Sequence, residues 1–335
     1  MRTLSLLAVI FAGLAAMPFV LVSDVWMNLA ILILYSALLG QAWNMLGGFG
    51  GQFSFGHAAF FGTGAYTVAV LQVQFGINPW IGLIAGGLAA VVVAVIIGYS
   101  TFRYGLRGSY FALVTLAFAE VLRILSNSVE ITGAGVGILI PLEQTASNLQ
   151  FADKASYYWI LWAMTLAAFL VAWWMGNSRF GAQLMAVRDN EDAARALGVA
   201  AYGVKMRAIM LSGFFSGLAG VFYAQYFLYL DPYIAYGPAI SIESLLVPII
   251  GGIGTLFGPL LGAVVLHGIS ELSRDLIGDV PGISLVLYGT LLVIMVLFMP
   301  RGLAGLFSLG RAKAKPAPKA ASVAADDKTG EAANA

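Results

Sequence analysis

Few side chains in this 335-residue sequence could carry catalytic chemistry. His57 and His267 are the only histidines and cysteine is absent, so a zinc site would have no thiolate ligands and at most two imidazole ligands, too few on their own. Each histidine is expected to be a hydrogen-bonded residue of the interior. Ser216 and His267 could nominally form a protease pair, but the sequence around Ser216 offers nothing that would activate its hydroxyl. The sequence therefore favours a protein that is not an enzyme and that holds no metal.

The sequence also lacks the motif of an ATP-binding loop. No lysine follows a glycine, so the Gly-Lys-Ser/Thr signature of a phosphate-binding loop is absent. An ion-coupled carrier would need acidic groups deep in the bilayer. Only Glu120 and Glu243 come near that depth. Arg123 follows Glu120 by one helical turn, which favours a structural ion pair, and Glu243 is expected at the outer mouth of its span. An ion-coupled secondary transporter is thus the alternative to a chain driven by other subunits.

The composition predicts an all-α, polytopic membrane protein. Hydrophobic residues make up 60% of the chain and charged residues 10%, against about 25% charged in soluble domains. A net charge of +1 gives no reason to expect a nucleic-acid partner. About ten apolar stretches are expected to cross the bilayer, at 4–22, 25–46, 54–75, 80–101, 108–126, 157–176, 207–229, 240–256, 259–277 and 282–299. Eight is the alternative, because the 240–277 stretch is interrupted by glycine and proline and could form a re-entrant hairpin.

The distribution of Lys and Arg predicts the orientation. Placing the N-terminus inside puts Arg103 and Arg107, the segment 177–207 and the basic residues from 301 to 319 in the cytoplasm, whereas the 127–156 segment, which is acidic, faces outward. Both termini are therefore expected in the cytoplasm. Residues 1–307 are expected to form one transmembrane permease domain, with a disordered cytoplasmic tail at 308–335. The 4–22 stretch could be a signal peptide, but a retained first span is favoured.

The segment 177–207 carries five of the seventeen Lys and Arg residues between long apolar runs. It contains the signals of a two-turn helix: a capping Asn, acids in the first turn, an i,i+4 ion pair and a terminating Gly. Ala193 and Ala194 are expected to give this helix a low, flat surface. Either it is a solvated connecting helix or it sits in a cleft of a cytoplasmic subunit. The residues assigned to such a coupling helix are Asn190, Glu191, Asp192, Ala193, Ala194, Arg195 and Gly198.

Two glycine-rich breaks interrupt the apolar runs and share a Gly-Gly-x-Gly pattern. The first includes Gly47, Gly48 and Gly50, and the second includes Gly251, Gly252 and Gly254. Paired interruptions in the two halves of a chain suggest an internal repeat and a substrate path. The residues expected to line that path are Gln52, Ser54, His57, Gly251, Gly252 and Gly254. Helix packing is the competing explanation for each of them.

Several stretches together resemble the permeases of ABC importers for branched-chain amino acids, of the LivM type. They are GGQFSFGHAAFFGTGAYT (50–67), LRGSYFALVTLAFAEVLRIL (106–125), SRFGAQLMAVRDNEDAARALGV (178–199), IGGIGTLFGPLLGAVVL (250–266) and MPRGLAGLF (299–307). Glu191-Asp192-Ala193-Ala194 with Gly198 is similar to the Glu-Ala-Ala…Gly loop by which such permeases contact their ATPases, with Asp192 as an extra residue.

This resemblance implies a subunit of the bacterial inner membrane that pairs with a second, similar permease. Two cytoplasmic ATPase subunits would bind the ATP, so no cofactor is expected in this chain, and a solute-binding protein would deliver the substrate. The implied substrates are branched-chain amino acids. Urea or short amides are the alternative, since close relatives of the family import them.

Overall fold

The computed structural model of the chain describes residues 2–21, 23–277, 286, 289–290, 293 and 302–307. The expected last span at 282–299 lies outside the described residues apart from those single positions, and the expected tail at 308–335 lies outside them altogether.

The described chain is mostly helical, with connecting loops and one short pair of strands. Its elements in order are α1 (Arg2–Val20), α2 (Asp24–Trp43), the π-helix η1 (Asn44–Gly48), α3 (His57–Phe75), α4 (Pro79–Phe102), α5 (Gly108–Ser128), η2 (Glu130–Thr132), β1 (Ile138–Leu139), η3 (Ala146–Asn148), α6 (Lys154–Asn177), α7 (Arg179–Asp189), α8 (Glu191–Ala196), α9 (Ala201–Phe227), β2 (Tyr229–Leu230), α10 (Pro232–Tyr236), α11 (Pro238–Gly251), α12 (Gly258–Ile277) and α14 (Gly302–Phe307). β1 and β2 pair antiparallel, with Ile138 opposite Leu230.

Seven segments of the described chain are long and apolar enough to cross a bilayer. They are α1, α2 with η1, α4, α5, α6, α9 and α10 with α11. α3 is a helix of 19 residues at the place expected for a span, and most of its side chains are buried. α12 also lies where a span is expected, and the apolar helix found in its described part covers Gly258–Leu272. A polytopic helical membrane protein is confirmed, whereas the count of ten or eight spans stays a prediction.

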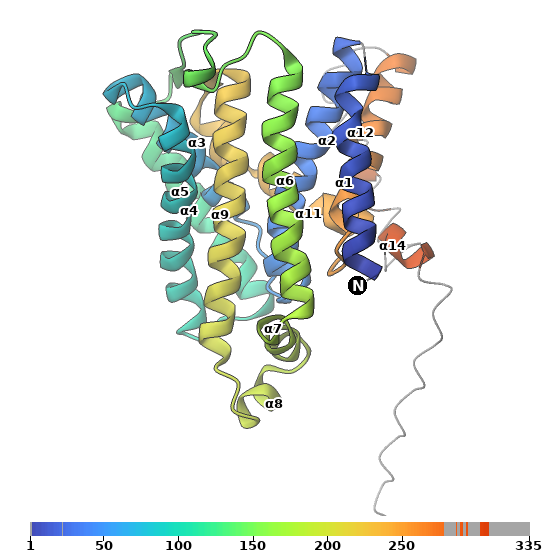
Figure 1. Cartoon of the computed structure of the whole chain (residues 1–335). Helices are drawn as coiled ribbons and strands as arrows, with labels where there is room; N and C mark the ends of the chain where they lie inside the picture. The colour runs from blue at the N-terminus through green and yellow to red at the C-terminus, as the bar shows by residue number, and fades with distance from the viewer. Residues whose placement is uncertain are drawn as a thin grey trace, which may run out of the picture.

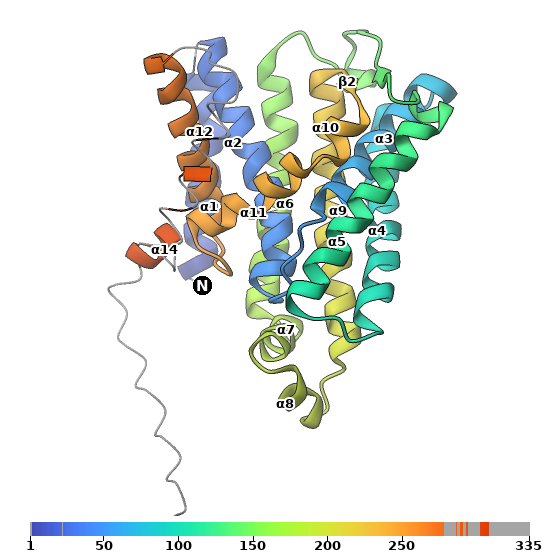
Figure 2. The same cartoon turned by 180° about the vertical axis from the view of Figure 1, so that it is seen from behind.

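Close helix contacts explain much of the glycine content. A Cβ on Gly64 of α3 would lie 2.1 Å from the carbonyl oxygen of Gly217 in α9, so neither helix could hold this distance with a larger residue at position 64. α3, α4 and α9 form one tight group in this way. In Figure 1 and Figure 2 this group and α5 lie on one side of α6, and α1, α2 and α12 lie on the other.

The two ends of the bundle differ. α7 and α8 project from one end, and the N-terminus lies toward the same end (Figure 1). The segment that joins α5 to α6 lies at the opposite end. This arrangement agrees with the topology expected from the basic residues, in which the N-terminus and the 177–207 segment share a side.

The interrupted stretch at 240–277 folds as two packed helices. α11 has 14 residues, which span about 21 Å at 1.5 Å per residue, less than the roughly 30 Å of a hydrocarbon core. The turn after it contains Gly252 at φ 128° and Gly254 at φ 71°, conformations that glycine adopts without strain. α12 then returns alongside α11. The break thus lies at the turn of a helical hairpin.

Candidate functional site

The charged segment forms two short helices with defined ends. Asn190 is extended, at φ −159°, and its side-chain oxygen accepts a hydrogen bond from the Ala193 amide at 3.0 Å. Gly198 ends the turn at φ 85°. The predicted cap and the predicted left-handed glycine are therefore confirmed, and the helix between them is α8. In Figure 1 α8 is the outermost element at its end of the molecule.

Glu191 is the centre of a buried ion-pair network. Its side chain is 6% exposed, and Lys205 Nζ, which is fully buried, lies 3.1 Å from each of its two oxygens. Arg195 Nη2 lies 2.6 Å from Oε1, and Arg107 Nε lies 3.0 Å from Oε2. Lys205 also sits 4.9 Å from the ring centre of Phe102. The predicted pair between Glu191 and Arg195 is confirmed, and two further cations that sequence reasoning missed complete it.

Arg107 ties α8 to the loop between α4 and α5. Besides Glu191 it contacts Asp192, with Nη2 3.1 Å from Oδ1. This hydrogen-bonded guanidinium holds the pKa of the Asp192 carboxyl below its ordinary value. α8 is therefore attached both to the start of α9, through Lys205, and to the start of α5, through Arg107. These contacts would transmit a displacement of α8 to α9 and α5.

The face of α8 that points away from the bundle differs from the predicted one. Ala194 is 3% exposed and packs with Val187 and Ala201, so the expectation of a docking surface at this residue is wrong. Ala193 is exposed, as expected. Leu197, just after the helix, is 86% exposed. The exposed residues of α8 and of the turn after it are Asp192, Ala193, Arg195, Ala196, Leu197 and Gly198, and we call them the outer surface of α8.

The two glycine-rich breaks meet in space. Asn44 Oδ1 accepts a hydrogen bond from the Gly254 amide at 2.8 Å, and Asn44 Nδ2 donates to the Thr255 carbonyl at 3.0 Å. A Cβ on Gly48 would lie 2.6 Å from the Gly254 nitrogen, so this contact requires glycine at position 48. Asn44 begins η1, and π-helical turns are frequent at functional sites. We call these contacts of residues 44–51 with 252–255 the break junction.

Arg188 of α7 joins the break junction to the charged segment. Its Nη1 donates to the Gly48 carbonyl at 3.2 Å. Gly51, at φ 66°, leaves room for the arginine stem, because a Cβ there would lie 2.4 Å from Arg188 Cγ. Arg188 stands two residues before Asn190, the cap of α8. One side chain thus connects the projecting helices to the first break.

The residues predicted to line a path take different places around this junction. Ser54 and His57 are buried and bonded within the chain, with His57 Nδ1 3.1 Å from Ser54 Oγ and Nε2 2.8 Å from Ser212 Oγ. Gln52 donates to the Gly50 carbonyl, while its own buried oxygen has no partner among the described residues. The glycines at 251, 252 and 254 lie at the turn between α11 and α12. Lining roles for these residues stay predictions.

The two membrane carboxylates have different surroundings. Glu120 forms the expected pair with Arg123, whose Nε lies 2.9 Å from Oε2. Glu243 is the sixth residue of α11, and Ser36 from the interior of α2 donates to it. Its expected place at an outer mouth is wrong, since mid-helix residues surround it. His267 is hydrogen-bonded to Ser36, as an interior histidine was expected to be.

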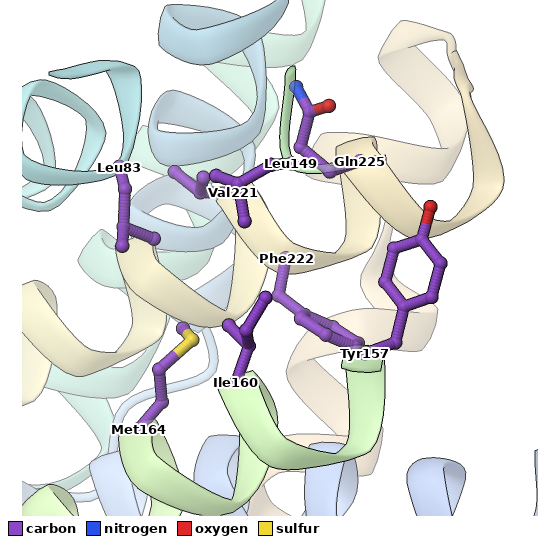
Figure 3. A pocket seen from close by; sticks show the side chains of 8 residues that line it. All are labelled: Leu83, Leu149, Tyr157, Ile160, Met164, Val221, Phe222 and Gln225. Carbon is purple, nitrogen blue, oxygen red and sulfur yellow. The ribbon is translucent and has the colours of Figure 1, made fainter. Parts of the chain in front are cut away.

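An enclosed cavity between α6 and α9 is too small for a solute. It is lined by side chains that include Tyr157, Ile160 and Met164 of α6 and Phe222 of α9 (Figure 3). Its volume of about 10 Å³ is room for about one water molecule. A substrate path is therefore not found at this place.

Comparison with known proteins identifies the family. Residues 25–296 match the model of the branched-chain amino acid transport system / permease component. The chain belongs to this family. It is an ABC-type permease and a multi-pass protein of the bacterial inner membrane, and the resemblance seen in the sequence is confirmed.

Relatives in this family include both permeases of one kind of importer. The LivM permease of the high-affinity branched-chain amino acid system of Escherichia coli is 30% identical, over 86% of this chain and 72% of its own. The LivH permease of Salmonella typhimurium is 22% identical, over 80% and 91%. The AraH permease of the L-arabinose transporter of Azospirillum brasilense is 26% identical, over 65% and 62%. No solved structure matches the chain.

Proposed function

We propose that this chain is one of two permease subunits of an ATP-driven importer of branched-chain amino acids. Two cytoplasmic ATPase subunits bind the ATP and grip the outer surface of α8. An extracytoplasmic solute-binding protein delivers the substrate, and both termini of the chain face the cytoplasm. The names of the LivM and LivH relatives support the substrate class and the pairing of two permeases.

One observation carries the coupling assignment: a leucine is 86% exposed at the tip of a helix that buried ion pairs hold in place. An isolated exposed leucine needs no explanation. A leucine on a six-residue helix anchored to α9 and to the α4–α5 loop is different, because the anchoring fixes its direction. An exposed apolar side chain on a helix that ion pairs hold in place is suited to insertion into a cleft of a partner. At such interfaces a few buried residues supply most of the binding energy.

The anchoring contacts describe how force would travel. A displacement of α8 by the ATPases would move α9 through Lys205, α5 through Arg107 and the break junction through Arg188. Both breaks respond together, since Asn44 holds them to each other. Opening and closing of a path beside residues 52–57 and 251–254 follows from this common movement.

Replacement of Leu197 by aspartate tests the proposal. Leu197→Asp places a charge in the partner's cleft and is expected to lower ATP-dependent leucine uptake by the assembled importer about tenfold or more, the effect of at least 1.4 kcal/mol. Leu197→Met, which keeps an apolar side chain of similar volume, is the control and should transport normally. Because Leu197 is exposed, neither variant should change the melting temperature of the permease. Normal uptake by Leu197→Asp would contradict the docking role of α8.

The substrate is tested separately, with the solute-binding protein of the same importer. Binding of leucine, isoleucine or valine supports the assignment, and binding of urea or short amides in their place would replace it. Uptake that a protonophore abolishes while ATP is held constant would instead identify an ion-coupled carrier.

A further inference from the structure

A polar cluster lies between the middle turns of α2, α11 and α12. Ser36 donates its hydroxyl proton to Oε1 of Glu243, and His267 Nε2 lies 2.6 Å from the same Ser36 oxygen. Since the single Ser36 proton is already given to the carboxylate, the histidine ring must donate its own Nε2 proton to Ser36. The two side chains therefore hold Glu243 in one orientation.

Glu243 has no firm cationic partner in the described part of the chain. His267 is the nearest cationic group found there, with Nε2 3.9 Å from Oε1. The other carboxylate at membrane depth, Glu120, has the arginine that Glu243 lacks. A carboxylate is costly to bury without a counter-charge, and such residues in transmembrane segments mark ion or substrate sites. The Glu243 side chain is 22% exposed, so a ligand can reach it.

A second polar group, the Tyr35 hydroxyl, lacks a hydrogen-bond partner in the described chain. The Tyr35 hydroxyl is buried and has no hydrogen bond among the described residues. Tyr35 directly precedes Ser36 on α2, so its side chain starts next to the serine that binds Glu243. The ring of Tyr223 on α9 lies beside it, with ring centres 6.0 Å apart. A buried hydroxyl without a hydrogen bond is costly, and beside a carboxylate that has no firm cationic partner it can serve as a second acceptor for a cationic ligand.

We propose that Glu243 and Tyr35 form a binding site for a primary ammonium group, that of the amino acid in transit. The inference rests on the proposed function. An ammonium brings one positive charge and three N–H donors. The carboxylate supplies the counter-charge and the phenol oxygen a further acceptor, while the faces of the Tyr35 and Tyr223 rings attract cations. Ser36 and His267 are positioning residues. Urea and neutral amides lack the charge that this site would select.

Tyr35→Phe gives the sharpest test, because a structural role and a binding role predict opposite results. The substitution removes only a hydroxyl without a partner, so the melting temperature should stay equal or rise. Loss of a hydrogen bond to a charged group should nevertheless lower leucine uptake by the assembled importer about tenfold. Tyr66→Phe is the matched control, since the Tyr66 hydroxyl is also buried and without a partner in the described chain. Unchanged uptake in Tyr35→Phe would overturn the site.

Glu243→Gln tests the charge with nearly the same shape. Leucine uptake should fall about tenfold or more, Glu243→Asp should recover part of it, and stimulation of ATP hydrolysis by the loaded binding protein should persist. Glu120→Gln is the control carboxylate and should transport normally. A lower melting temperature that Glu243→Asp does not restore would make the role structural and overturn the proposal.

Wild-type importer run in parallel separates this inference from the proposed function. Absence of ATP-dependent leucine uptake in the wild type refutes the proposed function, and the ammonium site with it. Normal wild-type uptake with equal uptake by Glu243→Gln refutes the ammonium site alone. Uptake abolished by a protonophore at constant ATP would identify a proton-coupled carrier and overturn both.

Discussion

The ion pair between Glu191 and Lys205 gives the strongest prediction about coupling. Glu191→Met removes the only anion that contacts the Lys205 ammonium in the described chain. Lys205 is fully buried at the start of α9, and its other close neighbour is the Phe102 ring. Three responses are then open. The Lys205 side chain stays buried and charged without an anion, or it stays buried and loses its proton, or it moves to solvent and α8 detaches from the bundle. The third response is expected, because α8 is short and lies at the surface of the bundle.

The free-energy cost of Glu191→Met follows from the burial of both partners of the ion pair. Breaking a buried ion pair on one side costs about 3–5 kcal/mol, since the other charge is left uncompensated. Arg107 and Arg195, the remaining partners of Glu191, are 43% and 47% exposed and can turn to water. The main cost therefore falls on Lys205. At 1.4 kcal/mol per factor of ten, the docked position of α8 should lose at least about two orders of magnitude in population.

The double variant Glu191→Met with Lys205→Met is the matched control. It replaces the whole pair by apolar side chains, which is often neutral or stabilising in buried positions. Lys205→Met alone should have a smaller effect than Glu191→Met, because Glu191 keeps two arginines. Both predictions follow from the burial of the Lys205 charge. The number of charges that each variant removes does not decide them.

Trypsin cleavage after Arg195 in the purified permease measures the undocked population, together with leucine uptake by the assembled importer. Glu191→Met should be cleaved about a hundred times faster than wild type and should lose uptake. The double variant should regain protection. Cleavage of the double variant as fast as that of Glu191→Met would refute the argument, since no unpaired buried charge is then left to explain it.

Three further predictions concern neighbouring contacts. Arg188→Leu should leave ATP hydrolysis near normal but lower uptake, because α7 loses its bond to the break junction; Arg179→Leu, at an exposed position of the same helix, should do neither. Asn44→Leu leaves the partly buried Gly254 amide without its acceptor, so the permease should lose about 1 kcal/mol or more of unfolding free energy, measured by denaturant titration. Because Arg107 lowers the pKa of Asp192, this contact stabilises α8 above the ordinary carboxyl pKa of about 3.9 and is lost as pH falls through the lower folded value. Hydrogen exchange of α8 should therefore quicken only in strong acid, and Asp192→Asn should remove that acid dependence.

Local rules explain which features could be predicted from the sequence. The cap at Asn190, the pair of Glu191 with Arg195 and the end at Gly198 all depend on residues within one or two turns of each other. Spans follow equally from composition within one window, and α4, α6 and α9 lie within a few residues of their expected places. For these features, all the interacting residues lie close together in the sequence.

Features that depend on distant partners could not be predicted in this way. Glu191 gains Arg107 from a position 84 residues earlier, and Ser36 meets Glu243 across 207 residues. A two-turn helix has too few residues for periodicity to show which side is buried. The error at Ala194 has this cause, because the burial of that side chain depends on how α7 and α9 approach α8.

The arrangement of α2 connects the two ends of the proposed mechanism. Asn44, immediately after this helix, holds the break junction, and Ser36 lies eight residues earlier, about 12 Å along the axis. α2 is largely buried over that stretch and continues into η1 without a loop, so a shift of the junction must carry Tyr35 and Ser36 with it. Glu243 is on α11, whose end forms the other half of the junction. The carboxylate and the tyrosine can therefore separate only if the junction also changes. On this argument Asn44→Leu should alter both the rate of transport and its dependence on leucine concentration, whereas Arg188→Leu, which leaves the junction bonds in place, should alter the rate alone.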